Sequence, residues 1–199
     1  FKPHFCQCLA LTKLLFRLTV NQHHSTQINN STCGNMKDLF LMRHGQAENG
    51  SRTVSDHLRA LTPRGRTECI RQGRRVHPEN DHRLIASSAI RTIQTAGLIA
   101  EVWAESGLIH TPTIEIEERG YLAEPDVWMH LASCSDEQFQ GLWCIGHNPG
   151  ISALVTVLTG EYMGLTTADL VHLKLNINRW SDIHSNCGAV AARYAPEGA

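Results

Sequence analysis

The chain has 199 residues, of which 42% are apolar and 19% charged, and its net charge is −1 with histidine counted as neutral. This length suits one α/β domain with one active site, and the composition excludes wholesale disorder. The overall balance of charge gives no support to a nucleic-acid partner, and no segment is long and apolar enough to imply a membrane partner. Any anion site must therefore be local.

The first 35 residues differ in composition from the rest of the chain. They contain no Asp or Glu, and an apolar stretch carrying Lys13 and Arg17 leads into the polar tract 21–35. Two interpretations stay open: a weakly basic leader, or a disordered extension without a role in the fold. We expect a domain boundary before Met36, with residues 36–199 folding and acting alone. The expected location is cytoplasmic, or organellar if residues 1–35 are a leader.

The first half of the domain predicts a β-α-β-α pattern. Residues 38–42 form a short apolar run typical of a strand buried on both faces of a sheet. Thr62 and Pro63 then favour a helix start, and the helix should continue to about Val76, before Pro78 and Asn80. A second strand is predicted at 84–88 and a second helix at 89–104.

The second half is less regular before it returns to the same pattern. Residues 111–139 predict an edge strand at 113–116, a helix starting near Pro125, and an insertion over the sheet that determines specificity. The remaining elements are a strand at 142–145, a buried helix at 151–158, and strands at 170–175 and 189–194. We therefore expect an α/β fold, a three-layer sandwich in which helices cover both faces of a mostly parallel central sheet.

Three of the predicted strands end in residues suited to binding an anion. They are followed by Arg43-His44-Gly45, by Ser87-Ser88 with Arg91 close behind, and by Gly146-His147. Carboxyl ends of strands in such a sheet converge on one crevice, where two arginines and two histidines would be costly without an anion between them. Because the arginine fork matches phosphate oxygens, this pattern indicates a phosphoryl group.

At these motifs the chain resembles a known family. Leu-Met-Arg-His-Gly-Gln-Ala, Ser-Ser-Ala-Ile-Arg-Thr-Ile-Gln-Thr-Ala and Ile-Gly-His-Asn-Pro-Gly resemble the histidine phosphatase superfamily, which is phosphoglycerate mutase-like, and in particular its SixA phosphohistidine phosphatase branch. The resemblance extends from Met36 nearly to the end, and includes Asp56, Arg59 and the run 61–65.

The resemblance implies a role for each matching residue. His44 would be the nucleophile, Arg43 and Arg91 would bind the phosphoryl group, and His147 would complete the site as a donor, with no metal and no cofactor. The partner would be a phosphohistidine protein or a small phosphorylated metabolite. Gly45 lacks a Cβ, so its backbone can approach the phosphoryl site and orient the His44 ring.

Physical chemistry supports these implied roles. A nucleophilic histidine must be neutral, with one ring nitrogen free and the other held by a hydrogen bond. Neighbouring guanidinium charge lowers the imidazole pKa and stabilises the phosphohistidine once it forms.

The general acid is the open position. Glu117, Glu118, Glu124 and Asp126 are candidates, and none is singled out by its pattern. A phosphoramidate releases an imidazole or amine more readily than a phosphate ester releases an alkoxide, so a phosphohistidine substrate would need no such acid. The alternatives are a non-catalytic phosphate-binding interaction module and, less favoured, zinc bound by some of the twelve histidines.

Overall fold

A computed structural model describes residues 36–77, 82–107 and 113–196, which lie within one compact unit. The expectations for residues 1–35, and for Pro78 and Asn80 as terminators of a helix, fall outside the described residues. In the part of the chain that is described, no helix has the length and apolar character needed to span a bilayer.

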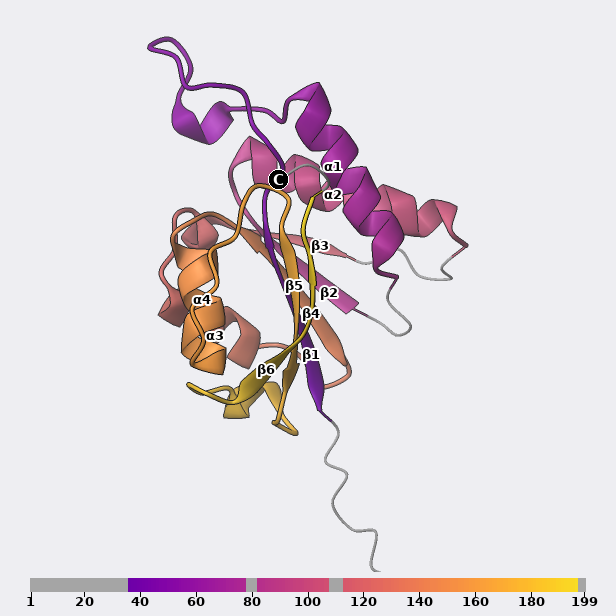
Figure 1. The fold of residues 1–199 in the computed structure, drawn as a ribbon, viewed down its shortest axis with the longest axis vertical. Coiled ribbons are helices and arrows are strands. Elements are labelled where there is room, and N and C mark those ends of the chain that lie inside the picture. The colour runs from indigo at the N-terminus through magenta and orange to yellow at the C-terminus, as the bar shows by residue number, and fades with distance from the viewer. Residues whose placement is uncertain (1–35, 78–81, 108–112, 197–199) are drawn as a thin grey trace, which may run out of the picture. The chain divides into compact units, whose positions relative to one another are not determined.

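The centre of the fold is a six-stranded sheet in the order β3-β2-β4-β1-β5-β6 (Figure 1). The first four of these strands are parallel to one another, whereas β5 and β6 run antiparallel to their neighbours. The bounds are β1 (Lys37–Arg43), β2 (His82–Ser87), β3 (Ile114–Glu117), β4 (Gly141–Gly146), β5 (Leu170–Leu175) and β6 (Gly188–Tyr194). The prediction of a mostly parallel sheet is confirmed, with β3 as an edge strand.

Helices cover both faces of this sheet, as the three-layer prediction requires. One face carries α1 (Pro63–Arg75) and α2 (Ile90–Glu105), and the other carries α3 (Pro125–Ser133) and α4 (Gly150–Thr159). Three short 3-10 helices complete the pattern: η1 (Asp56–Leu58), η2 (Glu118–Gly120) and η3 (Trp180–Asp182). The helix that begins at Thr62 was predicted to reach about Val76, and it ends at Arg75 with Val76 as its C-cap.

Strand β1 shows why the sequence forms this architecture. Leu39 and Leu41 point into the core under α3 and α4, whereas Phe40 and Met42 point into the core under α1 and α2. All four side chains are buried, and each contributes about 1.5–3 kcal/mol of burial free energy. The continuous apolar run therefore reflects a strand covered on both sides.

The sheet order places the ends of three strands side by side. Strand β4 pairs in parallel with β1 on one side and with β2 on the other, and Arg43 lies opposite Gly146 in the register. The carboxyl ends of β1, β4 and β2 therefore meet at one edge of the sheet, as the sequence motifs predicted.

Candidate active site

His44 follows β1 and is held in one tautomer. Its Nδ1 lies 2.7 Å from the carbonyl oxygen of Gly45, and Nε of Arg91 donates to its Nε2 over 3.2 Å. A carbonyl oxygen can only accept and an arginine nitrogen can only donate, so Nδ1 carries the proton and Nε2 carries a lone pair. The residue is buried, with only 7% of its surface exposed. His44 thus presents an unprotonated Nε2 within the site.

Gly45 is required by the close approach of helix α1. A Cβ at this position would lie 2.6 Å from Sγ of Cys69 and 2.8 Å from the carbonyl oxygen of Gly65, both in α1. The Gly45 amide donates to Oγ1 of Thr95 over 3.2 Å, while its carbonyl accepts from His44. The backbone of Gly45 therefore fixes the His44 ring from a position that has no room for a side chain.

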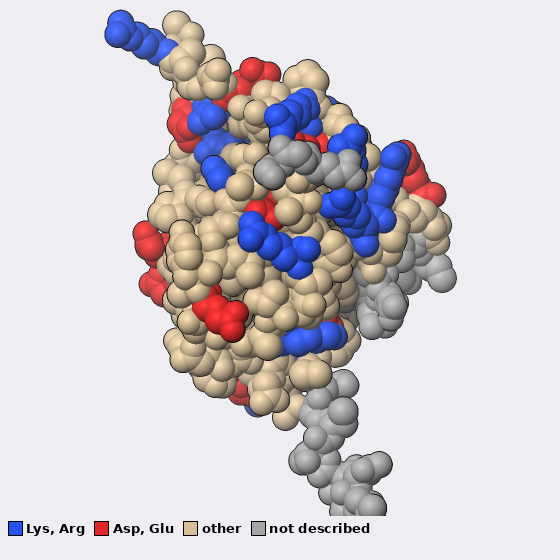
Figure 2. All heavy atoms as spheres, viewed as in Figure 1, with Lys and Arg blue, Asp and Glu red and all other residues tan. Residues whose placement is uncertain are grey.

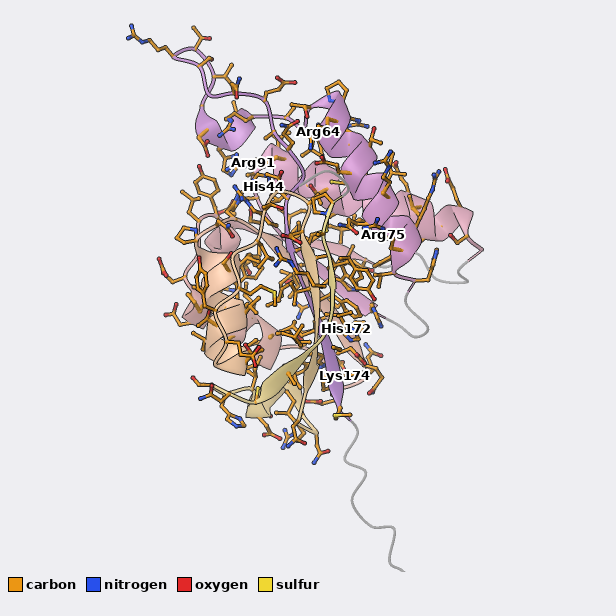
Figure 3. All side chains as sticks on the ribbon, in the orientation of Figure 1. His44, Arg64, Arg75, Arg91, His172 and Lys174 are labelled. Atoms are coloured by element: carbon orange, nitrogen blue, oxygen red, sulfur yellow. The ribbon has the colours of Figure 1, made fainter. Side chains whose placement is uncertain are left out.

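Arg91 lies near the start of α2 and connects most of the site. Besides its bond to His44, its Nη1 donates to the Asp56 carbonyl over 2.5 Å and its Nη2 to Asp56 Oδ2 over 2.9 Å. Arg91 is only 3% exposed, so its guanidinium is held in this direction by packing as well as by bonds. Figure 3 shows its side chain beside that of His44.

His147 follows β4 and is oriented by a chain of hydroxyl groups. Its Nδ1 lies 3.3 Å from Nη2 of Arg91, and its Nε2 lies 2.6 Å from Oγ of Ser87. Ser87 in turn contacts Oγ1 of Thr92 over 2.9 Å, and Thr92 donates to backbone carbonyls. With Arg91 as a donor, Nδ1 of His147 is an acceptor and its proton is on Nε2. The ring centroids of His147 and His44 are 5.1 Å apart.

Arg43 is the last residue of β1 and directly precedes His44. Its Nη1 donates to the carbonyl oxygen of Leu165 over 3.0 Å, and the same oxygen accepts from Nδ2 of Asn148 over 2.7 Å. Among the described residues, its Nε is buried without a hydrogen-bond partner. Its charge is one of the smaller causes that lower the pKa of both His44 and His147.

Asp56 and Tyr121 lie over Arg91. Asp56 accepts from Arg91, from Nη1 of Arg59 over 2.6 Å and from the hydroxyl of Tyr121 over 2.7 Å. The bonds from Tyr121 and Arg59 hold the pKa of the Asp56 carboxyl well below its usual range, so it is ionised at neutral pH. The Tyr121 ring packs edge-on against His147 with centroids 5.4 Å apart. Tyr121 was not predicted from sequence, since it lies in the irregular stretch without a motif.

Burial is the main cause of the electrostatic state of the two histidines. It lowers the pKa of His44 to about 4, and the charges of Arg91 and Arg43 lower it further, against the opposing hydrogen bond to Gly45. Burial likewise lowers the pKa of His147 to about 3, with His44 and Arg91 as further causes. Sequence reasoning named the guanidinium charge for His44, whereas desolvation is the larger effect. Both rings are neutral at neutral pH.

Among the described residues, no hydrogen bond or ion pair connects the candidate general acids with these groups. Glu117 pairs with Arg119 over 2.9 Å, which lowers its pKa. Glu118, Glu124 and Asp126 are exposed, and in the described part of the chain their side chains make no hydrogen bond. No group of three or more His, Cys, Asp or Glu residues suited to a metal occurs among the residues searched, which are the described ones.

Comparisons with known proteins agree with this arrangement. The histidine phosphatase superfamily (branch 1) profile matches residues 39–123. An uncharacterized protein of Mycobacterium leprae is 29% identical over 155 residues, which are 72% of this chain and 90% of that protein.

Solved structures show the same fold. A protein assigned as phosphohistidine phosphatase SixA of Nakamurella multipartitia has a TM-score of 0.69 at 21% identity, covering 82% of this chain and 98% of that chain. The protein histidine phosphatase SixA complexed with tungstate has a TM-score of 0.63 at 23% identity, covering 80% of this chain and 97% of that chain.

The matched segment begins in β1, contains His44, Asp56 and Arg91, and ends just after Tyr121. Residues 39–123 thus resemble the histidine phosphatase superfamily (branch 1). The fold is similar to that of the SixA structures.

Proposed function

We propose that this chain is a metal-independent phosphatase that acts through a phosphohistidine formed at Nε2 of His44. The observation that carries the proposal is the tautomer of His44: its Nδ1 proton is held by Gly45, and the lone pair of its Nε2 accepts from Nε of Arg91, a bond that the incoming phosphoryl group must displace. The lone pair of Nε2 attacks phosphorus, and the bond from phosphorus to the substrate nitrogen or oxygen breaks with its electrons on the leaving group. Water then breaks the Nε2–P bond, which releases inorganic phosphate and restores His44.

The surrounding residues bind the transferring group. Arg43 and Arg91 hold phosphoryl oxygens, and Gly45 keeps the His44 ring in position. Nη2 of Arg91 bonds to both Asp56 and His147, so a phosphoryl oxygen binds it only by displacing one of them, whereas Nη1 keeps a second N–H beside its bond to the Asp56 carbonyl. Nδ1 of His147 is an acceptor in this structure, so His147 donates to the phosphoryl group only after it takes up a proton, which a nearby dianion favours.

The substrate is a phosphohistidine in a protein or, in second place, a small phosphorylated metabolite. Asp56 is the carboxylate bonded to Arg91, and its lowered pKa makes it a poor proton donor. In the described structure no hydrogen bond or ion pair joins the four candidate acids to His44, Arg91 or His147. The second ring nitrogen of a phosphohistidine can take a proton from solvent, so the group leaves as neutral imidazole without a general acid from this chain, which supports phosphohistidine as the substrate.

Substitution of the nucleophile tests the proposal. We expect His44→Ala to abolish turnover of phosphohistidine protein, aryl phosphate and sugar phosphates, together with the acid-labile phosphoenzyme. The control is His130→Ala, which removes an exposed histidine of α3 and should leave each rate unchanged. Among the substrates, kcat/KM should be highest for phosphohistidine.

Two results would contradict this account. Turnover by His44→Ala at the rate of the unsubstituted chain would exclude His44 as nucleophile. Binding of phosphate by the unsubstituted chain without turnover of any substrate would instead favour the phosphate-binding module.

A further inference from the structure

The outer face of α1 is strongly basic although the chain as a whole is not. The helix carries five of the eighteen Lys and Arg residues, and all five are exposed: Arg64, Arg66, Arg71, Arg74 and Arg75. Its single acid, Glu68, has a side chain only 7% exposed and bonds to Arg64 over 2.7 Å. Figure 2 shows the blue side chains gathered over this helix. We call these five residues the basic α1 face.

The basic α1 face begins next to the candidate active site. The amide of Thr62, the N-cap of α1, donates to the carbonyl oxygen of Gln46 over 2.9 Å, and Gln46 is two residues from His44. With thirteen residues, α1 extends about 20 Å from that point. In Figure 3 Arg64 lies at the end of α1 nearest His44 and Arg75 at the far end.

A hollow of about 320 Å³ continues the basic surface past Arg75. Its lining includes His77, His82, His172 and Lys174. Among the described lining residues the one acid is Asp38, which bonds to His172 and accepts from Nζ of Lys174 over 3.0 Å. Arg75, at the end of α1, lines the same hollow and donates from Nη1 to the carbonyl oxygen of Ala195 over 2.8 Å.

We propose that the basic α1 face docks an acidic surface of the protein whose phosphorylated side chain enters the active site. The inference rests on the proposed function and narrows its substrate to a macromolecule, because a small metabolite at His44 does not reach Arg71 or Arg75. Arginine forks bind carboxylates in pairs of parallel hydrogen bonds, and a single-sign surface speeds the encounter with an opposite charge. A protein partner is favoured over a nucleic acid because one partner polypeptide then carries both the phosphorylated side chain and the acidic residues that contact the basic α1 face.

Synthetic phosphohistidine peptides test the inference by distance. In one peptide a block of four Glu begins about six residues from the phosphohistidine, a separation of about 20 Å in an extended chain. In the matched peptide the four Glu are Gln. We expect kcat/KM for the acidic peptide to exceed that for the Gln peptide by about tenfold at low salt, and the ratio to approach one at about 0.5 M salt.

Variants of α1 identify the surface responsible. Arg71→Gln, Arg74→Gln and Arg75→Gln combined should remove the preference for the acidic peptide and leave kcat/KM for an aryl phosphate unchanged. Gln keeps the helix propensity, and thermal unfolding checks that the fold persists. The matched control is Arg179→Gln, which removes an exposed charge beside η3, on the face covered by α3, and should keep the preference.

The measurements distinguish a failure of the docking proposal from a failure of the proposed phosphatase function. Equal rates for both peptides in the unsubstituted chain would overturn the docking surface and leave the phosphatase intact. No hydrolysis of any phosphohistidine would overturn both. If a short DNA duplex bound at about 0.15 M salt, and the triple variant lost this binding but kept the peptide preference, the face would bind nucleic acid and the proposal would be wrong.

Discussion

Single residues show how the unliganded site balances its own charge. Asp56 supplies a carboxylate to Arg91, and Asp56 is itself held by Arg59 and Tyr121. In the unliganded site the chain itself thus provides the anion beside Arg91 and Arg59. His44 and His147 stay neutral beside these charges because they are buried.

The titration of His44 is the first prediction at this scale. In the unliganded chain the ring should protonate with a pKa of about 4, below the ordinary histidine value of 6.5, because burial penalises the charged form. In Arg91→Gln the pKa should rise but stay below 6.5, since the removed charge is a smaller cause than burial. NMR of the ring nitrogens against pH measures both values. A wild-type midpoint near 6.5 would show that the ring is solvated.

At the scale of elements, two glycines determine how α1 meets the segment after His44. A Cβ on Gly65 would lie 2.1 Å from the backbone oxygen of Gln46, which is a contact with backbone and not with a flexible side chain. The same segment carries Gly45, whose carbonyl holds His44. The start of α1 therefore supports the position of the candidate nucleophile.

A matched pair of helix glycines tests this contact. Gly65→Ala should lower the free energy of unfolding by about 2 kcal/mol or more, because the neighbouring backbone must move. Gly97→Ala in α2, where a Cβ would meet nothing within 4 Å, should raise it by about 0.5–1 kcal/mol. Urea unfolding of both variants measures the difference. Equal free energies of unfolding for the two variants would mean that the backbone after His44 moves away from the added Cβ at no cost in stability.

Most elements of this fold could be predicted from local patterns. The apolar runs of β1, β2 and β4 and the Thr62-Pro63 start of α1 lie close to the predicted bounds, since burial on both faces and helix capping leave local signals. The antiparallel direction of β5 and β6 has no such signal, because it depends on how distant strands pair.

The site was predictable only where its residues follow strand ends. Arg43, His44, Arg91 and His147 follow β1, β2 and β4, so the topology brings them together. The hydroxyl of Tyr121 donates to Asp56, which lies 65 residues earlier in the sequence. No motif or spacing in the sequence predicts this hydrogen bond. The presence of Tyr121 over the site follows from the packing of η2 against β2.

At the scale of the whole molecule, an overall charge near zero conceals an uneven distribution. The sum of −1 includes a helix with five exposed arginines that begins beside the site. Net charge governs the solubility of the chain as a whole, whereas the choice of partner depends on the charge of the surface around the reacting group. The docking proposal accordingly treats the site and the basic α1 face as one surface.

The most direct test of the account is the position of the phosphoryl group in a trapped intermediate. The complete chain is mixed with a labelled phosphohistidine substrate, quenched in base during the first turnover, and digested for ³¹P NMR and mass spectrometry. We expect an acid-labile phosphoryl group on Nε2 of His44, because Nδ1 is protonated and bonded to Gly45. Label on Nδ1 or on another residue, or turnover without label, would contradict the central claim.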